Sequence, residues 1–266
     1  MIFGKHINRY YIRFLPLILL GLGALVLVAV MLLSVLSGPL SVLASAEEVP
    51  FGVAFDGAYA KVGEPMTVTV SGASGSVSYS WTVDGKAVST EASYTPTEDD
   101  LMKWIAVTVT AGKETATAEM FFSKLPVVYI NTENGAPIVS KEDYINAELI
   151  IQGNETYNSD TTTLYNGVTE IRGRGNSTWG QPKKPYKLKL DKKTDVFGMG
   201  KNKHWVLLAN YLDESLQRNT LAYNLSGAMG MEQMSTVFVD VVLNGDFVGN
   251  YQLCENIRAD SSRADI

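Results

Sequence analysis

Apolar and polar residues alternate in short runs between residues 50 and 123. The runs are MTVTV at 66–70, VSYSWTV at 77–83, WIAVTVT at 104–110 and TATAEMFF at 115–122. Alternation with a period of two residues is typical of half-buried strands, and Asp84-Gly85 is a favoured hairpin turn. Short strands at regular spacing predict a small β-sandwich over 50–123, with Trp81 in its centre.

A second set of strands is predicted after Pro126. The runs are AELIIQG at 147–153, NGVTEIRGRG at 166–175, KPYKLKLDKK at 184–193, KHWVLLANY at 203–211, TVFVDVVLNG at 236–245 and FVGNYQLCENI at 247–257. An antiparallel sheet with one helix is an α+β pattern, which we predict for a second module over 125–266. The joint between the modules is expected between Ser123 and Val127, and limited proteolysis is expected to cut there.

The period changes from 2 to 3.6 residues after Asp213. Leu216, Leu221, Leu225 and Met229 follow at spacings that fit one face of a helix. Asp213 is placed to cap the start of this helix, and Gly230 to end it. The pattern therefore predicts a helix from Asp213 with one apolar face that is partly buried.

The first 46 residues form an apolar leader. Lys5, Arg9 and Arg13 precede a run without charges from Phe14 to Ala46, which is long enough to enter a membrane. The small residues of ASA at 44–46 fit a signal peptidase site, so 1–46 is either a cleaved signal peptide or a retained membrane anchor. Both alternatives predict that the rest of the chain is exported, because positive charges remain in the cytoplasm.

Composition narrows the possible functions. The 266 residues carry a formal net charge of -6, so we do not expect nucleic acid as a partner. Cys254 is the single cysteine of the chain and cannot form an intramolecular disulfide. His204 is the only histidine outside the leader, which disfavours a closed zinc site or a hydrolase with a nucleophile and a histidine base. We interpret both Cys254 and His204 as packed strand residues.

Positive charge is concentrated between Glu170 and Lys193. Eight cations lie in this stretch: Arg172, Arg174, Lys183, Lys184, Lys187, Lys189, Lys192 and Lys193. Strand alternation directs Tyr186, Leu188 and Leu190 to one face of a strand, and Lys187 and Lys189 to the other. This pattern fits an ordinary half-exposed strand, and it also fits an anion site in which glycines let backbone amides approach a phosphate.

An acidic stretch, Glu98-Asp99-Asp100, is the other charged feature. Hard-cation sites need ligands from several positions in the sequence. We therefore interpret this stretch as a solvated loop in preference to half of a calcium site.

Four segments together resemble the N-terminal half of the spore coat protein H (CotH) kinase family. They are IRGRGNSTW, KKPYKLKLDKK, KHWVLLANYLDESLQRNTLAYNL and VFVDVVLNGDFVGNYQLCENI, and the resemblance extends from about Tyr129 to the last residue. The resemblance implies an atypical protein-kinase-like fold that uses ATP and magnesium to phosphorylate serine or threonine of extracellular or coat proteins. The run YTPTEDDLMKW in the first module is similar to bacterial immunoglobulin-like surface domains.

The resemblance also implies roles for particular residues. The glycine turn with Arg174, Asn176 and Ser177 would lie near the phosphates, and Lys187 or Lys189 would bind them. The helix from Asp213 would act as the C helix of a kinase, with Glu214 or Arg218 as its inward polar contact. Glu255, after Cys254 in the last strand, would lie where adenine is read.

The catalytic residues of the family are expected downstream of Ile266. The Trp-Asp-x-Asp run of its C-terminal half does not occur here, so no catalytic residue and no metal ligand is assigned in this chain. We expect a fragment that transfers no phosphate alone and leaves apolar surface uncovered, including residues of the helix from Asp213 and of the last strand. The alternative function is adhesion by a surface protein that carries a kinase-derived fold on an immunoglobulin-like stalk. The expected partners are an extracellular or coat protein substrate and, if the leader is not cleaved, the membrane.

Overall fold

The computed structural model describes residues 49–154 and 163–256. The predicted leader lies outside these residues. Within the described ranges, no helix is both long and apolar enough to cross a membrane.

The first module consists of two antiparallel sheets. One sheet contains β1 (Gly52–Phe55) and β2 (Val68–Ser71); the other has the order β4-β3-β5-β6, with β3 (Val77–Val83), β4 (Lys86–Ser89), β5 (Trp104–Ala111) and β6 (Glu114–Phe121). Side chains from both sheets share one core, in which Trp81 is fully buried and packs against Phe55 and Tyr94. The indole nitrogen of Trp81 donates to the Glu91 carbonyl oxygen at 2.9 Å. The central position predicted for Trp81 is confirmed.

The turn chemistry of this module follows the sequence, but the acidic stretch does not. Asp84 and Gly85 both have positive φ, 47° and 76°, as the tight turn between β3 and β4 requires. Asp100, which we expected to be solvated, is instead buried at the end of the short 3-10 helix η1 (Glu98–Asp100). Its carboxylate accepts hydrogen bonds from the Thr97 amide at 2.7 Å and from the Tyr94 hydroxyl at 2.9 Å. Asp100 therefore closes a loop of the sandwich.

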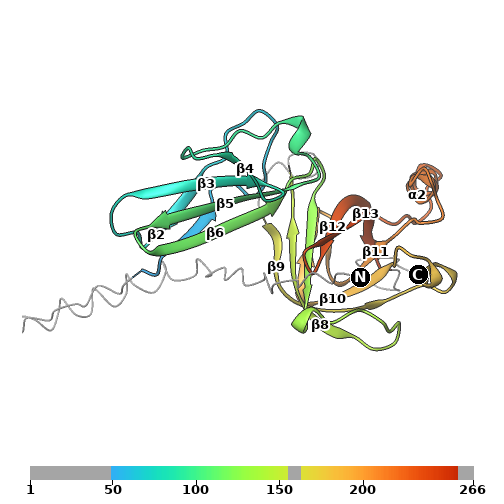
Figure 1. Cartoon of the computed structure of the whole chain (residues 1–266). Helices are drawn as coiled ribbons and strands as arrows, with labels where there is room; N and C mark the ends of the chain where they lie inside the picture. The colour runs from blue at the N-terminus through green and yellow to red at the C-terminus, as the bar shows by residue number, and fades with distance from the viewer. Residues whose placement is uncertain (1–48, 155–162, 257–266) are drawn as a thin grey trace, which may run out of the picture.

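The second module is a closed seven-stranded barrel (Figure 1). Its strands are β7 (Val127–Thr132), β8 (Ile145–Gln152), β9 (Thr163–Gly173), β10 (Tyr186–Asp195), β11 (Lys201–Leu208), β12 (Thr236–Leu243) and β13 (Asp246–Glu255), in the order β10-β11-β13-β12-β7-β8-β9. The ring closes where β9 pairs with β10, and β12 pairs with β7 in parallel. Two short 3-10 helices, η2 (Glu133–Gly135) and η3 (Ser177–Gly180), lie in its loops.

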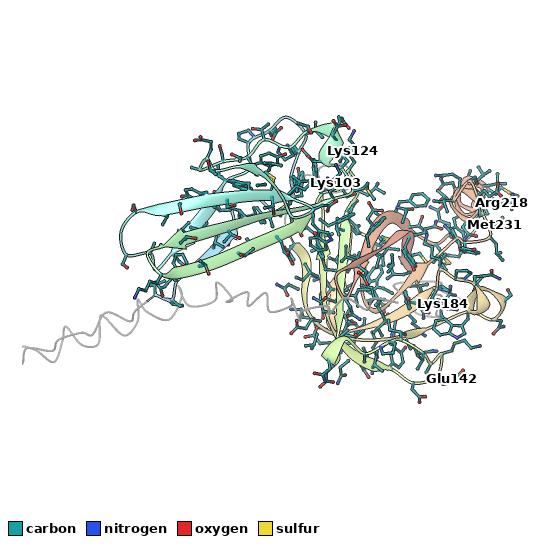
Figure 2. All side chains as sticks on the ribbon, in the orientation of Figure 1. Lys103, Lys124, Glu142, Lys184, Arg218 and Met231 are labelled. Atoms are coloured by element: carbon teal, nitrogen blue, oxygen red, sulfur yellow. The ribbon has the colours of Figure 1, made fainter. Side chains whose placement is uncertain are left out.

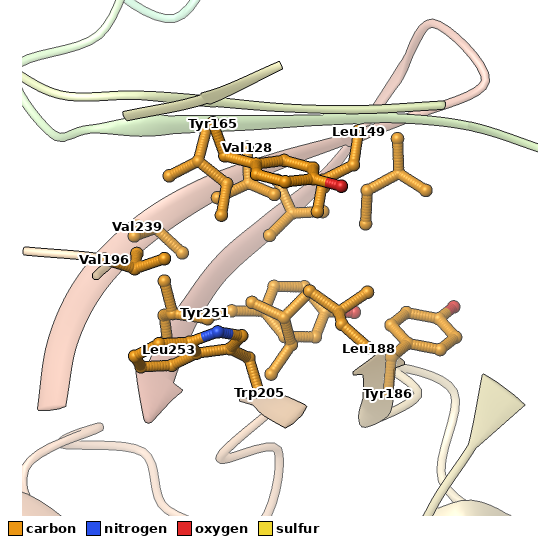
Figure 3. Close-up of a cluster of buried hydrophobic side chains, with 14 of the residues drawn as sticks. Val128, Leu149, Tyr165, Tyr186, Leu188, Val196, Trp205, Val239, Tyr251 and Leu253 are labelled. Carbon is orange, nitrogen blue, oxygen red and sulfur yellow. The ribbon is translucent and has the colours of Figure 1, made fainter. Parts of the chain in front are cut away.

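The interior of the barrel is filled by every second side chain of its strands. Figure 3 shows Val128, Leu149 and Tyr165 meeting Leu188, Trp205 and Leu253 from the opposite wall. All six side chains are buried, so the barrel has a packed core.

The predicted α+β, kinase-like architecture is wrong. The described chain is mostly β, and α2 (Arg218–Ala228) is its α-helix, lying at the edge of the barrel in Figure 1. This helix begins at Arg218 instead of Asp213. The Asp213 carboxylate accepts hydrogen bonds from the backbone amides of Ser215 at 3.1 Å and Arg218 at 2.8 Å, and these bonds hold the segment before the helix in a turn. Gly230, with φ 74°, ends the helix as expected.

The two modules are packed against each other at their joint. The Ser123 hydroxyl donates to the Asp240 carboxylate of β12 at 2.6 Å, and both residues are buried. Phe121 stacks on Phe247 with ring centroids 4.9 Å apart, and Trp104 contacts both Phe121 and Tyr129. Lys124 is the exposed residue in the joint, where it pairs with Glu98 at 2.8 Å.

Candidate functional site

The candidate site is the outer face of β9 and β10. Tyr186, Leu188 and Leu190 point into the barrel, which confirms the predicted alternation and places Lys187 and Lys189 outside. Arg172 of β9 and Arg174, one residue after the strand, lie on the same outer side, since the buried Ile171 and Gly173 alternate with them. We call these four cations, Arg172, Arg174, Lys187 and Lys189, the basic face.

The strand register sets two different charge pairs across the basic face. Glu170 lies opposite Lys189, and the two side chains form an ion pair. This hydrogen bond raises the pKa of Lys189, so its ammonium group stays charged. Arg172 lies opposite Lys187, and like charges directly opposite each other on neighbouring strands are unfavourable. The register therefore places two positive charges next to each other at Arg172 and Lys187.

Tyr144, just before β8, is an aromatic platform beneath this face. The Arg172 guanidinium lies 5.0 Å and the Lys189 ammonium 5.8 Å from the centre of its ring. The Nε atom of Arg172 is buried and has no hydrogen-bond partner among the described residues. A buried unsatisfied donor is costly, and a bound oxyanion would satisfy it.

Helix α2 borders the basic face through Tyr223. Burial of Tyr223 and the proximity of Cys254 raise the pKa of its phenol, and Arg174 opposes this effect. Tyr223 is thus close enough to both residues to interact with them electrostatically. Cys254 is fully buried on β13, as predicted for a packed strand residue.

The glycines of IRGRGNSTW have a packing role in the structure. A side chain at Gly173 would overlap the Trp179 ring, and one at Gly175, where φ is 84°, would overlap the Thr178 hydroxyl. Lys184, labelled in Figure 2, donates to the Trp179 carbonyl oxygen at 2.7 Å and lies over its ring. Both glycines therefore let this loop fold tightly against the end of β9.

The structure brings only some of the predicted site residues together. Asn176 and Ser177 are exposed in the loop after β9, next to Gly175. Glu255 lies two strands away from β10, where its carboxylate accepts the Ser235 amide at 2.9 Å.

Glu214 and Arg218, the candidates for the inward polar contact of the predicted C helix, also have other surroundings than expected. Glu214 is exposed, and Arg218 pairs with Asp213 at 3.4 Å instead of reaching into the barrel. Lys189 takes its acidic partner, Glu170, from the neighbouring strand. The expected C-helix contact is therefore replaced by a pair within the sheet.

Sequence reasoning assigned no role to Arg172, Tyr144 or Tyr223. Arg172 stands in the basic stretch, so its charge was visible, but its partner across the strands was not. Tyr144 and Tyr223 come from segments 28 residues before and 51 residues after Arg172, and no sequence pattern connects them to it.

The donor set of the basic face fits an oxyanion such as phosphate. Guanidinium groups match phosphate geometry with paired donors, and lysine ammonium groups act as compact point charges. Among residues 49–154 and 163–256, no group of three or more His, Cys, Asp or Glu side chains could hold a metal ion. The described residues thus fit the anionic part of a nucleotide, and we assign none of them to magnesium.

Comparison with known proteins points to the same part of the chain. The family model described as CotH kinase protein matches residues 171–266. The match begins in β9, one residue before Arg172, and includes the whole basic face and α2. No curated protein matches the chain.

Proposed function

We propose that the basic face binds the phosphate groups of ATP, in a protein whose activity is phosphoryl transfer of the CotH kinase type. The observation that carries this proposal is the buried Nε donor of Arg172, which has no hydrogen-bond partner among the described residues. Such a donor is unfavourable without an acceptor, and an oxyanion would supply one. Lys187 lies opposite Arg172 on the neighbouring strand and adds a second positive charge there.

The chemistry of the neighbouring groups supports a polyphosphate in preference to a single carboxylate. Arg172 lies near the end of β9 and Arg174 follows the strand by one residue, while Lys187 and Lys189 are two residues apart on β10. Side chains at this spacing start roughly 7 Å apart, and long Arg and Lys side chains can converge from there on neighbouring phosphate groups. Magnesium, when bound, would neutralise charge on the same phosphates.

The wider setting of this activity is also a proposal. The apolar leader supports export, so the acceptor would be serine or threonine of an extracellular or coat protein. The first module, with its two sheets around Trp81, would be an immunoglobulin-like spacer that holds the barrel away from the cell surface.

Nucleotide binding by lysine variants tests the proposal. We expect the chain to bind an ATP analogue that carries a fluorophore on its ribose. Unlabelled ATP and tripolyphosphate should displace this analogue, and adenosine should not. Replacing Lys187 and Lys189 together with methionine should weaken binding at least tenfold, because each lost charge-assisted contact contributes about 1.5–3 kcal/mol. The fold should persist, since the apolar stems remain.

Lys192 and Lys193 provide a matched control on the same strand. Both are exposed, and neither belongs to the basic face. Their double replacement with methionine removes the same charge and should change ATP affinity less than twofold. Equal effects of the two double variants would show that only net charge matters, and the basic face would then be an ordinary solvated surface.

A further inference from the structure

Helix α2 presents its apolar side chains to solvent. Leu221 and Leu225 of α2, and Met229 directly after it, are 70%, 58% and 64% exposed, in agreement with the apolar surface that we expected to be uncovered on this helix. Positions four residues apart lie on one helix face, so they form a continuous stripe. Figure 2 places Arg218 and Met231 of this region at the outer edge of the molecule.

Polar side chains attach the opposite side of α2 to the barrel. The fully buried Gln252 of β13 donates to the Thr220 hydroxyl at 2.9 Å and accepts from Asn210 at 3.1 Å. Asn219 donates to the Asn210 amide oxygen at 2.8 Å. The usual orientation of a surface helix is reversed, because its polar side faces the protein and its leucine side faces outward.

The exposed apolar surface is large enough for an interface. Tyr211 and Leu212 before the helix and Met231 after it are also exposed. The six side chains together present on the order of 600 Å², against the roughly 800 Å² that each partner buries in a standard interface. A patch of this size marks an interaction site more often than a free surface.

We propose that this stripe binds the same stripe of a second copy of the chain, as an antiparallel helix pair on a twofold axis. Leu221 and Met229 lie four residues on either side of Leu225. Antiparallel pairing centred on Leu225 therefore sets each Leu225 against its counterpart and each Leu221 against the partner's Met229. The stripe is complementary to itself, as a twofold interface requires.

Charge also favours this pairing. Arg218 lies three residues before Leu221 on the same face, and its side chain is 78% exposed. In the antiparallel arrangement Arg218 approaches the exposed Glu232 of the partner and the carbonyl end of the partner helix. A cation is favourable at that end of a helix. A lipid surface fits less well, because Arg218 is the single cation of α2 and Glu214 and Glu232 flank the helix.

Cysteine cross-linking of the full chain tests this arrangement. Leu225→Cys should give a disulfide-linked dimer under mild oxidation, whereas the wild type, whose Cys254 is buried, should not. Val168→Cys is the matched control, since Val168 is an apolar side chain 60% exposed on β9, away from α2. It should cross-link at least tenfold more slowly than Leu225→Cys.

A mixture of two variants tests the direction of the helices. Chains with Leu221→Cys and chains with Met229→Cys should cross-link to each other faster than either variant cross-links to itself. Leu225→Glu should weaken the dimer about 100-fold in sedimentation experiments, because it places two carboxylates together in an apolar contact. All three side chains are exposed, so these changes should leave the fold intact.

Three results would overturn the proposal. They are equal cross-linking at Leu225 and Val168, preferential self-cross-linking of Leu221→Cys, and wild-type association that does not stop at two copies. The proposal is independent of nucleotide binding, since no residue of the basic face is changed.

Discussion

Replacing Gly173 with alanine tests the packing role of the glycine-rich segment. A Cβ at this position would lie 2.8 Å from Trp179 Cε3 and closer still to Cζ3 and Cη2. Carbon atoms pack at about 3.5–4.0 Å, so the indole ring must move by roughly 1 Å or leave its place. Gly173 has no positive φ, and its backbone therefore accepts alanine without strain.

The expected cost follows from these contacts. Forcing a methyl group into a packed site costs about 1–3 kcal/mol. Alanine returns roughly 0.5–1 kcal/mol of that cost, because it loses less conformational freedom than glycine in a strand. The net loss should be about 1–2 kcal/mol in the free energy of unfolding, or roughly 2–4 °C in Tm for each kcal/mol.

A double-mutant cycle in urea measures this steric conflict. Trp179→Ala removes the ring, so Gly173→Ala should cost about 1 kcal/mol less in that background than in the wild type. Gly180→Ala is the control, since no heavy atom lies within 4 Å of a Cβ at Gly180. Additive costs of the two changes would refute the packing role, and the glycine would then need another explanation.

Two further predictions concern the anchor of α2 and the buried Asp100. Gln252→Leu removes the hydrogen bonds to Thr220 and Asn210, and it should speed hydrogen exchange of the α2 amides at least tenfold. Thr220→Val should give a smaller change. Unchanged exchange rates in Gln252→Leu would mean that other contacts hold the helix. Burial alone would raise the pKa of Asp100, but hydrogen bonds from Thr97 and Tyr94, together with Lys103, outweigh it and lower the pKa. The carboxylate therefore stabilises the fold above the unfolded pKa of about 3.9, and this contribution is lost as the pH falls through the lower folded value. The Tm difference between wild type and Asp100→Asn should be largest near neutral pH and shrink below about pH 4; a difference independent of pH would contradict this assignment.

Local patterns in the sequence were sufficient to predict most strands and several turns. The strand predicted over 77–83 matches β3, and the turn predicted at Asp84-Gly85 has the positive φ values that such a hairpin needs. The outward direction of Lys187 and Lys189 was also predicted correctly. These features depend on neighbouring residues, because strand alternation and turn geometry are set within a few positions along the chain.

The arrangement of the basic face could not be predicted from local sequence patterns alone. The sequence shows that Arg172 and Lys187 are both cations, but only the register of β9 against β10 places them opposite each other. Tyr144 reaches them because β8 pairs with the other edge of β9. A register shift of one residue would have turned each side chain to the other face of the sheet.

The sequence by itself thus determined where strands form and which way their side chains alternate. The tertiary structure alone decided that the second module closes into a barrel, with β12 beside β7 in parallel, and that α2 turns its leucines outward. Barrel closure joins segments more than 100 residues apart, and a helix face is buried only if another element covers it. Neither condition is present in the periodicity of a single segment, which predicts that a helix has one apolar face but not which element covers it.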